Sequence, residues 1–131
     1  MDARRYLHRI DADVAPEATP SLELLAKLQR RHLQTVPFEN LDVVAGREIS
    51  IERGAHYEKI VEAGRGGFCY ELNGLFDWLL GELGFTTRFV EGRVNNGNGF
   101  SRRFAHAAVL VDLGAAGPPA SRSRGAPSLR R

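Results

Sequence analysis

The chain has 131 residues, a length that suits a single domain or one part of a larger protein. Its single cysteine excludes an internal disulfide and any metal site built from several cysteines, and is typical of a reducing compartment. The first residues lack the apolar core of a signal peptide, and no apolar run approaches membrane-spanning length. We therefore expect a soluble cytoplasmic protein without membrane partners.

The formal net charge of +2 is unevenly distributed. No acidic residue follows Asp112, whereas four arginines do: Arg122, Arg124, Arg130 and Arg131. Removing those four from the 18 basic residues leaves 14 against 16 acidic residues, so residues 1–114 carry a net charge of about −2. This balance argues against nucleic acid as a partner.

Two helices are predicted in the first 34 residues. Asp2 can cap a short helix that ends near residue 10. Its apolar side is formed by Tyr6, Leu7 and Ile10. Thr19 can cap a second helix with Pro20 at its first position, reaching about residue 34. Its buried stripe consists of Leu22, Leu24, Leu25 and Leu28. We expect its last turns to expose Arg30, Arg31 and His32.

The next segment is less regular. Residues 43–44 and 49–51 are apolar and flank a glycine, so they are interpreted as short extended pieces. A third helix is predicted over residues 53–62, with Gly64 as its C-terminal stop. Its buried residues are expected to be Tyr57, Ile60 and Val61.

The stretch 64–76, Gly-Arg-Gly-Gly-Phe-Cys-Tyr-Glu-Leu-Asn-Gly-Leu-Phe, places Cys69 between a glycine-rich turn and an apolar run. Apolar side chains follow Cys69 on one helical face, at Leu72, Leu75, Phe76, Leu79, Leu80 and Leu83. This pattern predicts a buried helix that starts at Cys69 and ends near residue 83, with a glycine behind it.

The position of Cys69 allows two interpretations. Free N–H groups at a helix start favour a thiolate by about 0.3–1 kcal/mol, whereas one pKa unit needs about 1.4 kcal/mol. Burial opposes ionisation, so Cys69 needs a cationic partner, usually histidine, to be a nucleophile. The alternative is a small apolar core residue.

The pattern changes from helical to alternating after residue 84. Residues 86–94 are β-branched, aromatic and alternating, which predicts a strand, and residues 95–99 form a turn. Residues 105–111 predict a second strand, buried on both faces after His106. Helices before strands indicate an α+β fold, with a helical subdomain at 1–84 and a sheet at 85–114.

Residues 115–131 show no periodicity and are expected to be disordered. Their residue types, Ala, Arg, Pro, Ser, Gly and Leu, can all be written with GC-rich codons. We therefore hypothesise a frameshift or premature end near Gly114, which would have replaced the native continuation.

Three ordered segments carry a family resemblance: Arg-Gly-Gly-Phe-Cys with Asn73 at 65–73, Val-Pro-Phe-Glu-Asn-Leu at 36–41, and Ala-His before an apolar strand at 105–106. They resemble the arylamine N-acetyltransferase family over residues 1–114. The resemblance implies a papain-like cysteine transferase scaffold, whose helical subdomain precedes the first strands of a β-barrel. It also implies acetyl transfer from acetyl-CoA to arylamine or hydrazine acceptors through a cysteine thioester.

The resemblance assigns catalytic roles to Cys69 and His106. Cys69 would be the nucleophile that accepts the acetyl group, and His106 would take the thiol proton and later assist the attacking amine. Without the family, His106 would be interpreted as a structural strand histidine. That interpretation is kept for His8, His32 and His56.

Four further residues receive supporting roles from the resemblance. Arg65 and Glu39 match a pair expected to form a salt bridge that braces the nucleophile turn, the alternative being independent surface charges. Phe38 resembles a residue that lines the amine pocket, with core packing as the alternative. Asn73 lies one turn beyond Cys69 and is expected to support the loop. Residues that bind the acetyl-CoA cofactor are unknown, and the scattered His and Cys predict no metal site.

The sequence departs from the family where the aspartate of the triad is expected. Residues 120–123 read Ala-Ser-Arg-Ser, and Asp112 lies about 20 Å from His106 along an extended strand. We therefore expect impaired activity, because losing the equivalent aspartate costs a serine protease about 10⁴ in turnover. A two-stranded hairpin is marginal in water and its edges invite pairing, which predicts low stability and self-association.

The leading hypothesis is an arylamine N-acetyltransferase. The alternatives are a non-catalytic remnant or interaction protein, an amide synthase of the same superfamily, and a papain-like hydrolase. The hydrolase is disfavoured, because only the transferase family explains the segments of Glu39 and Arg65 together.

Overall fold

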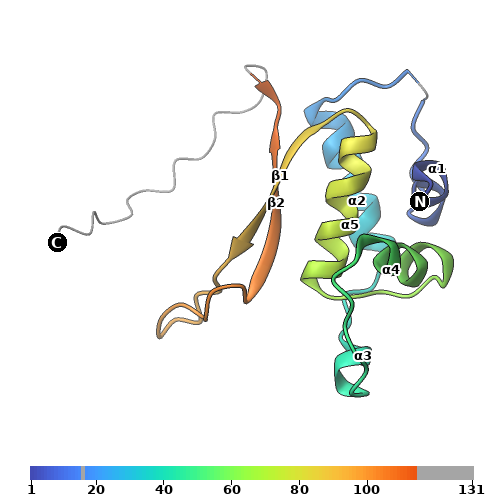
Figure 1. Ribbon diagram of the computed structural model, residues 1–131. Coiled ribbons are helices and arrows are strands. Elements are labelled where there is room, and N and C mark those ends of the chain that lie inside the picture. The colour runs from blue at the N-terminus through green and yellow to red at the C-terminus, as the bar shows by residue number, and fades with distance from the viewer. Residues whose placement is uncertain (16, 115–131) are drawn as a thin grey trace, which may run out of the picture.

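The computed structural model describes residues 1–15 and 17–114, and Figure 1 shows helices on one side and a small sheet on the other. The helices come first: α1 (Ala3–Arg9), α2 (Leu22–Thr35), α3 (Leu41–Val44), α4 (Arg53–Tyr57), the π-helix η1 (Glu58–Glu62) and α5 (Cys69–Glu82). Strands β1 (Thr86–Gly92) and β2 (His106–Asp112) follow. The predicted α+β fold is confirmed, while the expectation of a disordered tail at 115–131 falls outside the described residues. Among the described helices, none is both long and apolar enough to cross a membrane.

Both N-terminal helices begin at a polar cap. The Asp2 carboxylate accepts the N–H of Arg4 at 2.8 Å, as predicted. Helix α2 is capped by Ser21, whose hydroxyl accepts the N–H of Leu24 at 3.1 Å. The expected cap at Thr19 is therefore wrong by two residues, because Ser21 is the extended residue whose side chain reaches the free N–H groups.

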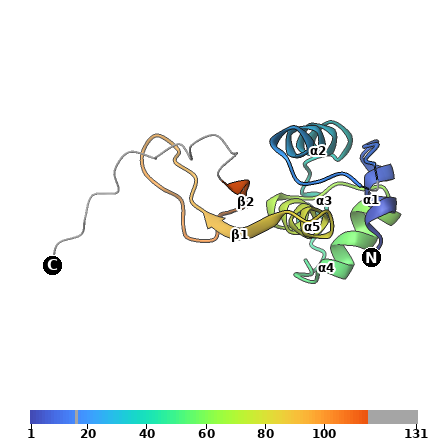
Figure 2. The ribbon, with the colours of Figure 1, turned by 90° about the horizontal axis from the view of Figure 1, so that it is seen from above.

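Helix α5 lies at the centre of the fold. Figure 2 shows it between the sheet and the surrounding helices α1, α2 and α4. Its predicted apolar face is confirmed, because Leu75, Leu79 and Leu80 are fully buried. They belong to a core that also contains Tyr6, Ile10, Leu28 and Ile60. The helix that carries Cys69 at its first residue is thus fixed by the core itself.

The last turns of α2 contain an unexpected core residue, His32. The expectation that His32 faces solvent is wrong, since only 5% of it is exposed. It lies one helical turn after the buried Leu28, on the same face, and its Nδ1 is 3.0 Å from the Tyr6 hydroxyl. Burial and, to a smaller extent, the positive charge of Arg9 lower the pKa of His32 to about 4.

Arg9 joins α1 to the C-terminal ends of two other helices. Its guanidinium donates to the carbonyl oxygens of Thr35 at 2.9 Å, Ile60 at 3.0 Å and Gly64 at 3.1 Å. Carbonyls at helix ends lack partners within the helix and favour a cation. Arg9 therefore fixes the start of the glycine-rich turn that leads to Cys69.

The segment between α2 and α5 was predicted only in part. The third predicted helix is confirmed as α4 followed by η1, with Gly64 at φ +66° behind it. Residues 43–44 are helical rather than extended, and 49–51 have no regular structure. The Glu39 carboxylate caps α3 by accepting the N–H of Leu41 at 2.6 Å, which outweighs the strand preference of the two valines.

The two strands form an antiparallel hairpin whose register pairs Gly92 with His106 and Thr86 with Asp112. The prediction that β2 is buried on both faces is wrong. Ala107 is fully buried, whereas Leu110 is 48% exposed. Helix α5 covers one face of the hairpin, and the described chain leaves the other face open (Figure 2).

Candidate active site around Cys69

The glycine-rich turn before Cys69 is held against the segment around Phe38. Gly67 donates its N–H to the Pro37 carbonyl at 3.2 Å, and the Glu39 N–H donates to the Gly67 carbonyl at 2.9 Å. A Cβ at Gly66 would lie 2.0 Å from the Pro37 oxygen, so only glycine permits this approach. The segments 36–41 and 65–73, which both carry the family resemblance, are therefore joined by an isolated parallel β-bridge between Phe38 and Gly67.

Cys69 is the first residue of α5 and is 7% exposed. The buried Glu71 caps this helix, because its carboxylate accepts the N–H of Phe68 at 3.0 Å. A Cβ at Gly67 would lie 2.6 Å from the same carboxylate, which explains the second glycine of the turn. The start of α5, and with it the position of Cys69, is set by contacts on both sides of the turn.

A network of charged side chains braces the turn. The expected pair exists: Arg65 lies 3.0 Å from the Glu39 carboxylate, so the two are not independent surface charges. Arg65 also contacts Asp42 at 2.8 Å, and Lys59 contacts Asp42 and Glu71, each at 2.8 Å. Hydrogen bonds from Arg65 and then Lys59 lower the pKa of Asp42 to about 2.

Three members of this network were missed by the sequence analysis: Asp42, Lys59 and Glu71. For Glu71 a signal existed, because it lies three residues after the residue that precedes the helix, the spacing of a capping box. Asp42 directly follows the 36–41 segment and Lys59 lies in η1 just before the turn, but neither belongs to a matched motif or to an apolar periodic pattern. Burial alone would lower the pKa of Lys59, but its bonds to the two carboxylates raise it.

His106 is exposed at the first position of β2. Helix α5 holds the backbone on both sides of it: the Tyr70 hydroxyl donates to the Phe104 carbonyl and the Asn73 amide to the Ala107 carbonyl, each at 2.7 Å. Asn73 therefore supports the strand, not the loop before Cys69 as expected. These bonds hold the backbone on both sides of His106 against the first turns of α5, the helix that begins at Cys69.

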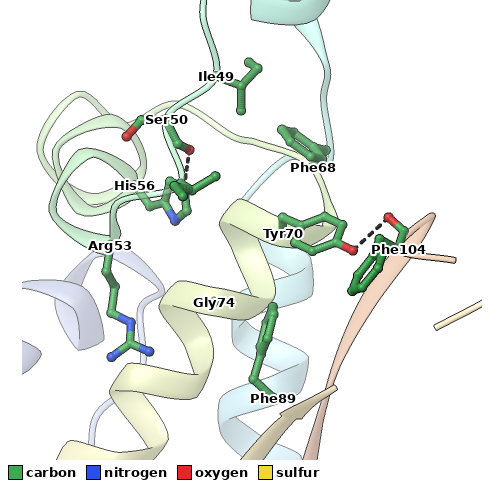
Figure 3. Close-up of a pocket in the computed structure, with 10 residues that line it drawn as sticks. Ile49, Ser50, Arg53, His56, Phe68, Tyr70, Gly74, Phe89 and Phe104 are labelled. Atoms are coloured by element: carbon green, nitrogen blue, oxygen red, sulfur yellow. Dashed lines mark hydrogen bonds between the residues drawn. The ribbon is translucent and has the colours of Figure 1, made fainter. Parts of the chain in front are cut away.

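A pocket of about 610 Å³ adjoins this end of α5 (Figure 3). Its walls are mostly apolar and aromatic. They include Phe68 and Tyr70, which flank Cys69 in sequence, together with Ile51, Phe89 and Phe104. Burial raises the pKa of Tyr70, and the nearby Cys69 raises it further. Phe38 is absent from these walls and is 71% exposed, so the alternative of core packing for Phe38 is wrong.

Of the remaining polar candidates, His56 lines this pocket, whereas His8 and Asp112 do not. His56 is buried and its Nε2 is 2.8 Å from the Ser50 carbonyl, as expected of a structural histidine, whereas His8 is exposed. Asp112 lies at the opposite end of β2 from His106. Within residues 1–15 and 17–114, no three His, Cys, Asp or Glu side chains form a metal-ligating group.

Comparison with known proteins agrees with this arrangement. A family model for N-acetyltransferases matches residues 21–116. The arylamine N-acetyltransferase of Escherichia coli (strain K12) is 43% identical over 110 residues, which are 82% of this chain and 38% of that protein.

Solved structures give the same result. A cysteine-to-glutamine variant of the Mycobacterium smegmatis arylamine N-acetyltransferase matches with a TM-score of 0.78 and 34% identity, over 89% of this chain and 44% of that chain. A Bacillus cereus arylamine N-acetyltransferase, described as having a Cys-His-Glu catalytic triad, matches with a TM-score of 0.75 and 31% identity, over 86% of this chain and 45% of that chain. The chain thus spans less than half the length of these relatives. Sequence and fold together place it in the arylamine N-acetyltransferase family, on the papain-like cysteine transferase scaffold.

Proposed function

We propose that Cys69 accepts an acetyl group from acetyl-CoA and passes it to an arylamine or hydrazine, with His106 as the proton carrier. The observation that carries the proposal is the pair of hydrogen bonds from α5 to the carbonyls of Phe104 and Ala107. They tie the backbone around His106 to the helix whose first residue is Cys69. His106 is thereby available as the cationic partner that a buried thiol needs.

The proposed reaction has two half-reactions. In the first, the Cys69 thiol gives its proton to His106, and its sulfur forms a bond to the acetyl carbonyl carbon. The bond from that carbon to the sulfur of CoA breaks, and His106 returns the proton to the departing sulfur. In the second, the amine nitrogen attacks the thioester, its proton passes through His106 to Cys69, and the acetylated amine leaves.

We further infer that turnover by this chain is low. Residues 120–123 supply no carboxylate to orient His106, and Asp112 is paired with Thr86 at the far end of the hairpin. Six residues of strand separate Asp112 from His106, which corresponds to about 20 Å. The bonds from Tyr70 and Asn73 support the His106 backbone, and no carboxylate among residues 1–15 and 17–114 is bonded to its imidazole, so the second half-reaction is the step expected to suffer.

The test is to incubate the chain with acetyl-CoA, measure its intact mass and map the modified residue. One acetyl group on Cys69, and none in a Cys69→Ala variant, is the expected result. An arylamine is then added and acetylated amine is quantified. If Cys69 carries the acetyl group but acetylated amine forms slowly or not at all, the result agrees with the inferred low turnover. A chain that takes up no acetyl group while folded is instead a non-catalytic remnant, which is the second candidate because the orienting carboxylate is missing.

A further inference from the structure

A buried ion pair stands at the start of the Cys69 helix. The Glu71 carboxylate is 5% exposed and accepts the backbone N–H of Phe68, the residue before Cys69. The Lys59 ammonium group reaches it from η1 and contacts both of its oxygens, at 2.8 and 3.0 Å. The proposed acetyl transfer assigns neither side chain a role.

Glu71 has two opposite effects on Cys69. As a cap it fixes the first turn of α5, and with it the position of the thiol. As a buried anion it disfavours a second negative charge nearby, and the thiolate form of Cys69 would be such a charge. A cap without charge, such as glutamine, would keep the first effect and remove the second.

Lys59 changes the charge balance at the start of the Cys69 helix. The network contains the carboxylates of Glu39, Asp42 and Glu71 and the cations Lys59, Arg65 and Arg47, the last of them 69% exposed and 3.5 Å from Asp42, so its net charge is zero. Without Lys59 the network would carry −1, and the charge beside Glu71 is screened poorly because the Lys59 side chain is only 14% exposed.

We propose that Lys59 is a positioning residue for Cys69: its ammonium group holds the Glu71 cap in place and neutralises it, so that Cys69 ionises beside an ion pair instead of a lone anion. The inference rests on the proposed function only in taking Cys69 as the reacting thiol. Other titratable or charged groups around this end of α5 come from every neighbouring element. They are Tyr70 on the helix, Glu39, Asp42, Arg47 and Arg65 in the network, Arg53 and His56 in the pocket wall, Glu91 on β1 with its partner Arg103, and His106 on β2.

The test is the pH profile of alkylation of Cys69 by iodoacetamide, read by intact mass. Because the chain has one cysteine, the mass reports Cys69 alone. Lys59→Met is expected to move the midpoint of the profile upward, which slows alkylation at neutral pH by about tenfold if the shift is one unit. Glu71→Gln is expected to move the midpoint downward, since glutamine can still accept the Phe68 N–H. Lys59→Arg keeps the positive charge and is expected to show the same pH profile as the original chain.

Opposite directions distinguish this role from a merely structural one. Both Lys59→Met and Glu71→Gln break the ion pair, so a structural role predicts shifts of the same sign. Equal signs, or no shift in either variant, would overturn the proposal.

The matched control is Lys27→Met on the exposed side of α2, which is expected to leave the profile unchanged. If Lys59→Met does not fold, an upward or absent shift in Glu71→Gln overturns the proposal by itself. Because alkylation needs no acetyl-CoA, failure of the proposed acetyl transfer would leave this result standing.

Discussion

At the scale of single residues, the turn before Cys69 depends on two glycines that face different neighbours. Gly66 lies against the backbone of Pro37, which cannot move without breaking the bridge to the segment around Phe38. Gly67 lies against the Glu71 carboxylate, the cap of α5. The chain can bring Cys69 to this position only because no Cβ stands between these groups.

Replacing Gly66 by alanine is expected to lower the free energy of unfolding by about 2–3 kcal/mol, the upper part of the usual range for overpacking. The new Cβ would lie 2.0 Å from the Pro37 oxygen, so the turn must shift. Urea denaturation measures the change. The control is Gly54→Ala in α4, where the Cβ has open space and alanine is expected to stabilise the helix by up to about 1 kcal/mol. Equal effects of the two variants would contradict the role of the close approach.

The sequence identified those site residues that lie in contiguous motifs. Cys69, Arg65 and Glu39 stand in two short segments, and the salt bridge between them is present. Lys59 and Asp42 could not be found this way, because both stand outside the matched motifs and their ion pairs form only in the folded chain. Their role depends on tertiary distance, which no local pattern encodes.

At the scale of elements, α5 serves both the core and the site. Its inner face is buried among α1, α2 and η1, while Tyr70 holds the backbone just before β2 and Asn73 holds the backbone of β2 itself. Its limits were predicted well because apolar periodicity, a preceding glycine turn and a following glycine all agree. The start of α2 was misplaced, because the Ser21 cap outweighed the preference of Pro20 for the first helical position. The helix α3 was missed, because the Glu39 cap outweighed the strand preference of Val43 and Val44.

Removing the amide of Asn73 is expected to loosen the hold of α5 on β2. Asn73→Ala leaves the Ala107 carbonyl without this donor and is expected to cost about 1–3 kcal/mol of stability. Hydrogen exchange of the β2 amides should rise, and acetylation of Cys69 should slow. Asn40→Ala is the matched control, since Asn40 makes no capping bond with its side chain. Unchanged exchange in β2 would show that the bond does not hold the strand.

At the scale of the whole molecule, stability is coupled to the protonation of a buried histidine. The pKa of His32 is about 4 in the folded chain, against about 6.5 for a free histidine. Between these values the unfolded chain binds more protons than the folded one, so the free energy of unfolding rises with pH. The contribution of His32 to the free energy of unfolding is fully present above about pH 6.5 and is lost as the pH falls to about 4.

The expected loss over that range is about 3 kcal/mol, from 1.4 kcal/mol per pKa unit. Urea denaturation at several pH values measures it in the original chain and in His32→Asn, which does not titrate. The variant should lose the slope between about pH 4 and 6.5, whatever its absolute stability. An identical slope in both chains would assign the acid sensitivity to other groups.

The sheet is the part of the molecule about which the sequence was least informative. The hairpin and its order were predicted, but the burial of β2 was overestimated because apolar residues alone do not reveal which face a helix covers. In the described chain β1 and β2 pair only with each other. Self-association through this sheet stays a prediction, which the molar mass in solution would test.

The central claim is that Cys69 and His106 act together on an acetyl group. Its most direct test is the rate at which acetyl-CoA acetylates Cys69 in the original chain and in His106→Gln, with circular dichroism to verify folding. Removal of a positioned proton carrier is expected to slow acetylation by about 10²–10⁴. An acetyl group that forms on Cys69 at the same rate in both chains, or that forms elsewhere on the chain, would contradict the account.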